Sequence, residues 1–559
     1  MVKFDKKITP DFTIQALVGA NLRSFSYNSS YITTNYLNVP ASSLNPAGFS
    51  FSNSRNPIQA ASWNSEMQVG SAYYSADFSY KNFINVSTTG RVDKLSTLPS
   101  GSNQFFYPSV SASTVISDYV RIPEPISFFK VRASYANVGS GLTRSSIGAN
   151  PSGSYFIGYG QQFFSSYDGP GFDNAGVYNT SLLYNNQPAA YYTNQLNNKN
   201  IKPDYNSSVE VGLDAKFLQN RIGLDVTYYQ SDLGPQIFSL TTSQASGYTS
   251  ALKNGIKTQR KGWEVSISGS PLRNPDGLNW DVLVNWATYR ETLKEIYPED
   301  PSIVQWPTNS FVSGSSGARY IKVGDRVDGY YNSAFAKDPN GNIIHDASGK
   351  ATRTPVAQFL GYVDPDYVFG INNKFSYKKV TLSFQFDGRV GGVIENQIQR
   401  QAFRGGRHIA TVEGDMGVAR ANDVLGVKSY LGQGVVLNGG KINYDVEGKI
   451  TNYNELSFAP NTTKQFLQDY ISFYYNTQEG NMMSRTYAKL REVTLGYSLP
   501  TKWFGNSIKQ FNVSFVARNL LYFAASKDMD IDQFATRQGS ADLQTPTTRR
   551  YGVNINVTF

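Results

Sequence analysis

The sequence has 559 residues, of which 51 are Lys or Arg and 42 are Asp or Glu, so the formal net charge is +9. Aromatic residues make up 14% of the chain and charged residues only 17%, a more aromatic and less charged composition than that of an average soluble protein. The chain has no cysteine and only two histidines, His345 and His408, which lie far apart in the sequence. This composition excludes disulfides and cysteine chemistry and argues against a zinc centre.

The basic residues are scattered along the chain, and no run of five to eight Lys or Arg occurs. The net charge therefore does not indicate a nucleic-acid partner. No stretch reaches the ~18 to 20 apolar residues that a membrane helix needs. A sequence this polar can cross a bilayer only as a closed β-barrel, because the lumen and loops keep the polar side chains while every backbone group is paired around the ring.

Alternation of apolar and polar residues predicts the strands in chain order. In the first, residues 12–22, Phe12, Ile14 and Val18 face one way and Gln15 and Asn21 the other. This criterion predicts roughly fourteen strands. They cover residues 12–22, 65–80, 82–93, 103–117, 126–137, 206–217, 221–231, 258–269, 279–289, 366–376 and 379–389, and three closing strands between 487 and 559.

The connections between these segments alternate between a few residues and tens of residues. Lys81-Asn82 joins two predicted strands tightly, whereas residues 138–204, 291–365 and 390–484 are long and polar. Outer-membrane barrels show this asymmetry because their periplasmic turns are short and their extracellular loops are long. The fold class predicted is therefore all-β, a transmembrane antiparallel β-barrel with meander topology and long extracellular loops.

The last strand ends the chain on an aromatic residue. Tyr551, Val553, Ile555 and Phe559 share one face. A strand that ends on Phe and carries Tyr at its start is typical of the closing strand of a bacterial outer-membrane barrel. We therefore predict that Tyr551, Gly552 and Phe559 form the signal read by the barrel-assembly machinery.

Several ordered segments, which together extend over nearly the whole chain, carry a family resemblance. They are Tyr107–Ala112, Lys130–Tyr135, Gly212–Asp214, Asn220–Leu224, Lys261–Val265, Asp364–Tyr367, Phe386–Arg389, Tyr487–Pro500, Ala517–Leu520 and Tyr551–Phe559. In this order they resemble the carboxy-terminal barrel portion of SusC-type TonB-dependent outer-membrane transporters, the SusC/RagA family.

The resemblance implies that residues 1–559 supply about strands 9 to 22 of a 22-stranded barrel, the size of large plugged transporters. It implies import of a bulky nutrient, an oligosaccharide or a peptide, across the outer membrane. It also implies a SusD-like surface lipoprotein as partner, and TonB acting through a plug domain. The plug and the amino-terminal strands have no counterpart in this sequence, and residues 1–7 show no secretory signal. We therefore expect the chain to be a piece of a longer protein, embedded in outer-membrane lipid.

An alternative of a different class stays open, in which the chain closes on itself as a fourteen-stranded porin or structural barrel, since an even strand number permits closure. A soluble β-rich adhesin is disfavoured by the asymmetry between turns and loops. No Ser-His-Asp arrangement or close carboxylate pair stands out, so neither an enzyme nor a cofactor is predicted.

Aromatic clusters in the long segments are the candidate substrate contacts, because flat rings stack on sugars or peptide side chains. The alternative is that they pack the loops or lie in the interfacial aromatic girdles. The candidates are Tyr191, Tyr192, Trp306, Tyr330 and Tyr331, and a further cluster is formed by Phe163, Phe164 and Tyr167.

The segment Asp338–Asp346 has carboxylates and amides at alternate positions, as a calcium loop does. It departs from an EF-hand because Gly341 stands at loop position 4 and no Glu closes the loop. A hairpin turn around Asn340-Gly341 is the preferred interpretation, and no metal site is predicted.

Overall fold

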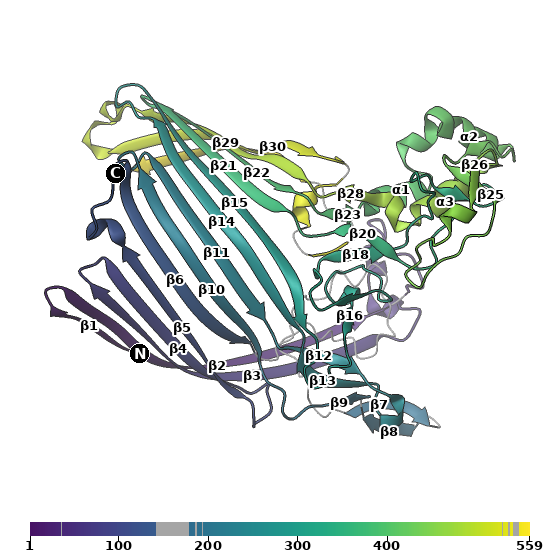
Figure 1. Ribbon diagram of the computed structural model, residues 1–559, viewed down its shortest axis with the longest axis horizontal. Helices are drawn as coiled ribbons and strands as arrows, with labels where there is room; N and C mark the ends of the chain where they lie inside the picture. Colours follow the sequence, from purple (N-terminus) through teal and green to yellow (C-terminus); the bar gives the residue numbers. More distant parts are fainter. Residues whose placement is uncertain are drawn as a thin grey trace.

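The computed structural model describes residues 1–34, 36–140, 178–184, 187–192, 194–527, 529–534, 537–539 and 547–559. Its main feature is one antiparallel sheet of fifteen strands, in which each strand pairs with the next one along the chain among those of the sheet (Figure 1). These strands are β1 (Val2–Thr9), β2 (Phe12–Thr33), β3 (Gln59–Tyr80), β4 (Ile84–Leu95), β5 (Gln104–Val115), β6 (Ile126–Ser140), β10 (Asp204–Phe217), β11 (Ile222–Leu233), β14 (Lys257–Leu272), β15 (Leu278–Glu295), β21 (Tyr367–Tyr377), β22 (Val380–Val390), β29 (Tyr487–Leu499), β30 (Gln510–Ala524) and β31 (Arg550–Thr558).

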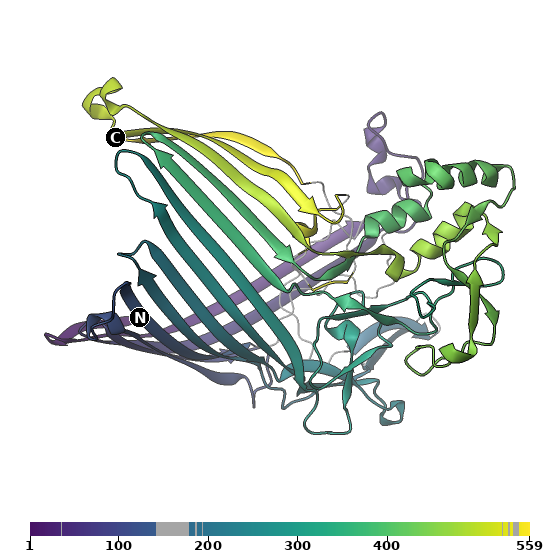
Figure 2. The same ribbon diagram turned by 45° about the horizontal axis from the view of Figure 1, so that its top comes forward.

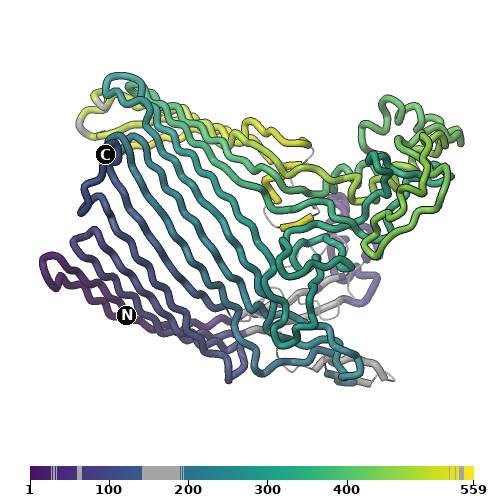
Figure 3. Tube along the Cα trace, in the orientation of Figure 1, coloured from purple at the N-terminus to yellow at the C-terminus, as the bar shows by residue number. Residues whose placement is uncertain are grey.

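The order of the strands confirms the predicted meander. In Figure 3 the colour passes across the sheet from purple to yellow without interruption. The sheet is strongly curved, and within the described residues β1 and β31 form its two ends without pairing to each other (Figure 2). A closed ring of fourteen strands is therefore not the arrangement observed.

The sheet has one strand more than the fourteen predicted. The additional strand is β1, which pairs antiparallel with β2 so that Phe4 faces Ala16 and Lys6 faces Ile14. The sequence did not reveal it because Lys6 interrupts the apolar side of an otherwise alternating segment. The other predicted strands are confirmed, and most of them extend further than the alternation showed.

Seven short turns join strands at one end of the sheet, which we call the turn end, and all the long connections lie at the other, the loop end. The predicted Lys81-Asn82 turn is confirmed, because both residues have positive φ angles of 48° and 62°, as a tight hairpin requires. Both chain termini lie towards the turn end (Figure 1).

The two faces of the sheet carry different side chains. Residues paired across strands point to the same face, so the rows Ala133, Val211, Tyr228, Trp263 and Leu382, Leu495, Phe515, Val553 are continuous apolar stripes. We call this the outer face. Its large apolar side chains are exposed, with Val211 at 54% and Ile555 at 60%. The opposite, concave inner face carries Glu210, Gly212, Asp225 and Thr227 and is predominantly polar away from the loop end.

Within the described residues, the long connections contain short strands and three α-helices. The helices, with β25 (Val435–Gly439) and β26 (Ser457–Pro460) beside them, form a lobe beyond the loop end (Figures 1 and 2). The helices are α1 (Gln397–Arg404), α2 (Gly414–Val424) and α3 (Leu467–Tyr475). The strands are β7 (Tyr178–Tyr184), β8 (Gln187–Tyr192), β9 (Gln195–Leu196), β12 (Gln236–Thr241), β13 (Ser250–Gly255), β16 (Gln305–Pro307), β17 (Tyr320–Lys322), β18 (Gly329–Asn332), β19 (Ile344–His345), β20 (Gln358–Tyr362), β23 (Val393–Glu395), β24 (Tyr430–Leu431), β25 (Val435–Gly439), β26 (Ser457–Pro460), β27 (Lys464–Gln465) and β28 (Met482–Ser484). Short 3-10 helices cover Pro46–Gly48, Phe51–Asn53, Ile116–Asp118, Gln244–Ser246, Thr308–Ser310, Ile409–Val412, Tyr453–Glu455, Gln478–Asn481, Thr501–Trp503, Gly505–Ser507 and Ile531–Gln533.

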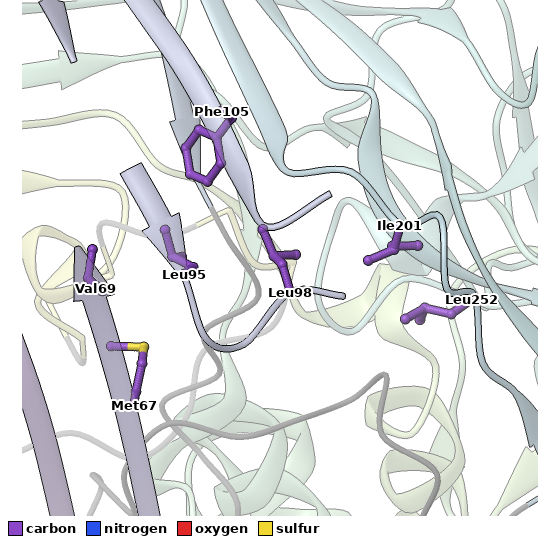
Figure 4. Packing of buried hydrophobic residues seen from close by; sticks show 7 residues of the cluster. All are labelled: Met67, Val69, Leu95, Leu98, Phe105, Ile201 and Leu252. Atoms are coloured by element: carbon purple, nitrogen blue, oxygen red, sulfur yellow. The ribbon is translucent and has the colours of Figure 1, made fainter. Parts of the chain in front are cut away.

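The buried apolar clusters lie at the loop end and in the lobe. One cluster joins the inner face of β3, β4 and β5 to the loop segment that carries Ile201, which is fully buried (Figure 4). Its members are Met67, Val69, Leu95, Leu98, Phe105, Ile201 and Leu252. The loops are therefore anchored onto the inner wall by ordinary hydrophobic packing. None of the helices in the described part of the chain combines the length and the hydrophobicity that crossing a membrane requires.

Candidate functional site: the inner wall and the loop assembly

The middle of the inner wall is built from charged side chains that pair across strands. Arg132 on β6 donates two hydrogen bonds to Asp225 on β11, at 2.9 and 2.7 Å, and a third to Thr227 at 2.6 Å. Arg132 reaches β11 by crossing β10 at Gly212, where an added Cβ would lie 2.5 Å from the guanidinium. A larger residue at that position would displace Arg132 from this pair, and the pair leaves a polar wall with little local excess charge.

At the loop end, one arginine holds the last loop onto this wall. Arg537, in the connection between β30 and β31, donates hydrogen bonds to Asp364 at 3.1 and 2.6 Å and to Glu291 at 2.9 Å. Glu291 also accepts bonds from Arg260 at 2.9 Å and from Thr258 at 2.6 Å. Burial alone would lower the pKa of Arg537, but its bonds to Asp364 and Glu291 raise it. The guanidinium is therefore charged at every physiological pH.

A second ionic cluster fixes the same connection to the neighbouring strand. Lys489 on β29 is almost fully buried and contacts Asp530 at 2.8 Å and Asp532 at 3.3 Å. Arg491 bridges Asp532, at 2.6 Å, to Asp387 on β22. These ion pairs tie the loop between β30 and β31 directly to β15 and β29, and Arg491 links the loop to β22 through Asp387.

The aromatic residues predicted to contact substrate are not brought together. Trp306 packs at right angles on Phe238, with ring centroids 5.0 Å apart, inside a buried cluster. Tyr192 is 66% exposed on β8, and the backbone of Tyr191 pairs there with Asn179. A role for these residues in substrate binding stays a prediction. Phe163, Phe164 and Tyr167 lie outside the described residues.

Tyr330 and Tyr331 are adjacent on β18 but have different surroundings. Tyr330 has no exposed surface and packs with Val312 and Val363, which is the loop-packing alternative. Tyr331 is half-buried, its ring is tilted against that of Phe359 with centroids 5.4 Å apart, and it lies beneath the guanidinium of Arg319. Of this pair, only Tyr331 has exposed surface.

The Asp338–Asp346 segment forms a hairpin turn, which was the preferred interpretation of its sequence. The Asp338 carboxylate accepts hydrogen bonds from the backbone N–H of Asn340 and Asn342 and from the Asn342 amide, at 2.8 to 2.9 Å. Gly341 has a φ of +85°, the left-handed conformation that glycine adopts readily. The same turn recurs at Asp346 and at Asp445, each followed three residues later by a glycine with positive φ. The carboxylates are occupied by the turns themselves.

The lobe is held together by contacts between two long connections. His345, in the loop between β15 and β21, stacks on Tyr470 of α3, in the loop between β22 and β29. Its Nδ1 lies 3.1 Å from the carbonyl oxygen of Ile343, so Nδ1 carries the proton and Nε2 accepts the Tyr470 hydroxyl at 3.0 Å. Burial lowers the pKa of His345 and keeps the imidazole neutral.

We expect this histidine to make the lobe sensitive to mild acid. The pKa of His345 in the folded state lies below its unfolded value of ~6.5. The neutral imidazole therefore makes its full contribution to the free energy of unfolding above pH ~6.5. Below that pH the contribution is lost at up to ~1.4 kcal/mol per pH unit. Protease resistance of the lobe should therefore drop between pH 7.5 and 5.5. His345→Gln should flatten this dependence. An unchanged slope in the variant would assign the acid sensitivity to other groups.

Comparisons with known proteins give the family. Residues 4–387 match the family model described as "TonB dependent receptor-like, beta-barrel". TonB-dependent receptor P26 of Formosa agariphila is 23% identical over 426 residues, which are 72% of this chain and 39% of that protein. Receptor P3 of the same organism is 22% identical over 360 residues, 61% of this chain and 33% of that protein. The chain thus spans between a third and two fifths of these curated relatives.

The fold is found in solved structures of the RagAB peptide transporter. The alignment with one of these structures covers the whole of this chain and 54% of the solved chain, with a TM-score of 0.68 at 15% sequence identity. The RagAB importer in the "open-open" state gives a TM-score of 0.65 over the same shares. At this identity the likeness shows a common fold.

The curved antiparallel sheet, its apolar outer face and its polar inner wall define the chain as a β-barrel protein of the bacterial outer membrane. The chain belongs to the TonB-dependent receptor-like β-barrel family. That family consists of receptors and transporters and not of enzymes. The turn end of the sheet is then periplasmic and the loop end extracellular.

Of the predicted assembly signal, Tyr551 lies on the outer face of β31, Gly552 on its inner face, and Phe559 directly follows the strand. Tyr551 is exposed and stacks on Phe515 at 6.3 Å, and the side chain of Phe559 is 75% exposed. We expect deletion of Phe559 to leave the protein unassembled in the periplasm, whereas Thr558→Ser, one residue earlier, should assemble normally. The measurement is the amount of heat-modifiable barrel in the membrane fraction. A normal amount of heat-modifiable barrel after the deletion would show that Phe559 is not part of the assembly signal.

Proposed function

We propose that the chain forms the wall of a transporter that imports a bulky nutrient, an oligosaccharide or a peptide, across the outer membrane. The observation that carries the proposal is a fifteen-stranded wall with a polar inner face and an elaborate extracellular loop assembly, in a chain of this family. A wall of paired charges such as Arg132 and Asp225 suits passage of a polar solute, because it presents hydrogen-bonding groups without a strong field.

In this proposal the chain supplies the carboxy-terminal fifteen strands of a 22-stranded barrel. The remaining strands and a plug domain belong to the rest of a longer protein, and TonB acts through that plug. The unpaired ends β1 and β31 support this arrangement, because a strand edge exposed to lipid leaves its backbone groups without partners. The alternative of a self-contained porin is not supported, because an antiparallel meander closes on itself with an even number of strands and this sheet has fifteen.

A SusD-like surface lipoprotein is the proposed partner at the extracellular end. The solved RagAB structures are named as a peptide transporter, which supports a peptide as one substrate class. The exposed ring of Tyr192 and the half-buried ring of Tyr331 are the proposed contacts for substrate on this side.

Growth of a deletion strain on a panel of glycans and peptides as sole carbon source tests the proposal. We expect the strain to lose growth on one substrate class and to recover it with the restored gene, but not in a strain that lacks TonB. Undiminished growth on every substrate, or rescue that does not need TonB, would contradict it.

A further inference from the structure

The inner wall holds a groove near its periplasmic end. The groove has a volume of about 530 Å³ and crosses β10, β11, β14, β15, β21, β22 and β29. Small residues form its floor: Gly223, whose added Cβ would meet the Ser268 hydroxyl at 2.5 Å, and Ser268 and Ser383 on the neighbouring strands. Larger side chains on these strands would fill the hollow, so the sequence keeps it open.

Four cations and two carboxylates line the groove. The cations are Lys216, Arg221, Arg273 and Lys374, all of them exposed, and the carboxylates are Asp281 and Glu492. Among the residues that the structure describes, none of the four cations forms an ion pair. Arg273 donates only to neutral groups, the Ser270 hydroxyl and the Asn220 carbonyl oxygen.

The two carboxylates offset these cations only in part. Glu492 is engaged by Arg518 at 2.7 Å. Asp281 accepts the Ser270 hydroxyl at 2.7 Å and keeps its own charge, opposite Lys374 on β21, so one free carboxylate faces four cations. Higher on the same wall the charges balance, as in the Arg132–Asp225 pair. The periplasmic end of the wall therefore carries a local positive excess above a hollow of suitable size for several carboxylates.

We propose that this groove binds a carboxylate-bearing chain lying along the inner wall. Clustered cations over a concave polar surface attract anions, and Lys and Arg side chains donate charge-assisted hydrogen bonds to carboxylates. The carboxylates come either from an acidic solute in transit or from an acidic polypeptide segment of the receptor itself. The inference goes beyond transport, because it concerns binding at one place on the wall.

The first experiment measures binding of fluorescent hexaglutamate to the complete receptor, purified from outer membranes in detergent. We expect saturable binding that weakens with salt, and a Kd about tenfold higher for the Lys216→Gln/Lys374→Gln variant, since each exposed ion pair contributes modestly. Hexaglutamine is the control probe. Lys94→Gln/Lys130→Gln is the control variant, because it removes the same charge from the same sheet outside the groove.

The second experiment separates the two sources of carboxylate. A photo-reactive benzoylphenylalanine replaces Asn372 in the centre of the groove. A cross-link to an acidic segment of the receptor, with hexaglutamate excluded, assigns the groove to the receptor's own polypeptide. A cross-link to hexaglutamate assigns it to a solute.

The proposal is overturned if neither kind of cross-link forms. It is also overturned if the receptor shows no cross-link to its own acidic segment and hexaglutamate binds no more tightly than hexaglutamine, or binds equally to both double variants. Binding in detergent needs no transport. Failure of these measurements would therefore leave the proposed function intact, and undiminished growth of the deletion strain would contradict the proposed function without affecting this site.

Discussion

Arg537→Ala is expected to release the connection between β30 and β31 from the inner wall and to lower the free energy of unfolding by about 3 kcal/mol. The guanidinium is the partner of Asp364 and one of two cations on Glu291, which is 5% exposed. Removal leaves both carboxylates desolvated and incompletely paired. The value lies at the lower end for a broken buried pair because Arg260 still binds Glu291.

Two measurements check this result: the denaturant midpoint of the detergent-folded receptor and the rate of protease cleavage within residues 525–549. Arg518→Ala is the matched control, because its side chain is 59% exposed and its pair with Glu492 should contribute at most ~1 kcal/mol. Equal midpoints for the two variants would show that Arg537 does not anchor the loop.

Lysine at Val211 or Ile555 is expected to destabilise the folded protein by about 2 to 4 kcal/mol. Both side chains lie exposed on the outer face, where a charge would have to enter the hydrocarbon of the bilayer. Lysine at Asn554, the inner-face neighbour of Ile555, should have a mild effect because that side chain meets water. Folding titrations into lipid vesicles compare the three variants.

Equal sensitivity at Ile555 and Asn554 would contradict the assignment of the two faces. A loss at Ile555 alone, with Val211→Lys neutral, would instead place Val211 outside the hydrocarbon layer and restrict the lipid-contacting belt to other positions of β10.

Strand alternation predicted the sheet because each strand needs only its own residues to divide into two faces. The register of β10 against β6 and β11 follows from matching the apolar sides, and the structure has that register. Strand β1 was not predicted because Lys6 interrupts the row of apolar residues on one of its sides. Strands β2 and β3 have 22 residues each, whereas a strand needs only ~9 to 11 residues to cross a bilayer. Beyond the bilayer neither face meets lipid, so the sequence there need not alternate.

The loop assembly could not be predicted because its contacts join residues that are distant in sequence. Arg537 is 173 residues from Asp364 and 246 from Glu291. The sequence shows only that Tyr330 is an aromatic residue in a long loop. Its burial depends on the other loop segments that pack around it.

Two local signals were nevertheless available. The Asp338 turn is repeated as Asp-x-x-Gly at Asp346 and Asp445, so all three hairpins could have been found together. Asn396 directly precedes helix α1, and its side chain accepts a hydrogen bond from the backbone N–H of Gln399, the spacing of a helix N-cap.

The alternation of lipid-facing and lumen-facing side chains along one strand is the central claim, and it can be measured directly. Because the chain has no cysteine, single cysteines at the positions from Ser207 to Lys216, with Gly212 left in place beneath Arg132, can carry a nitroxide label in lipid vesicles. We predict high accessibility to oxygen at positions 209, 211, 213 and 215 and high accessibility to a water-soluble nickel complex at 208, 210 and 214. Equal accessibility at neighbouring positions, or the opposite phase, would contradict it.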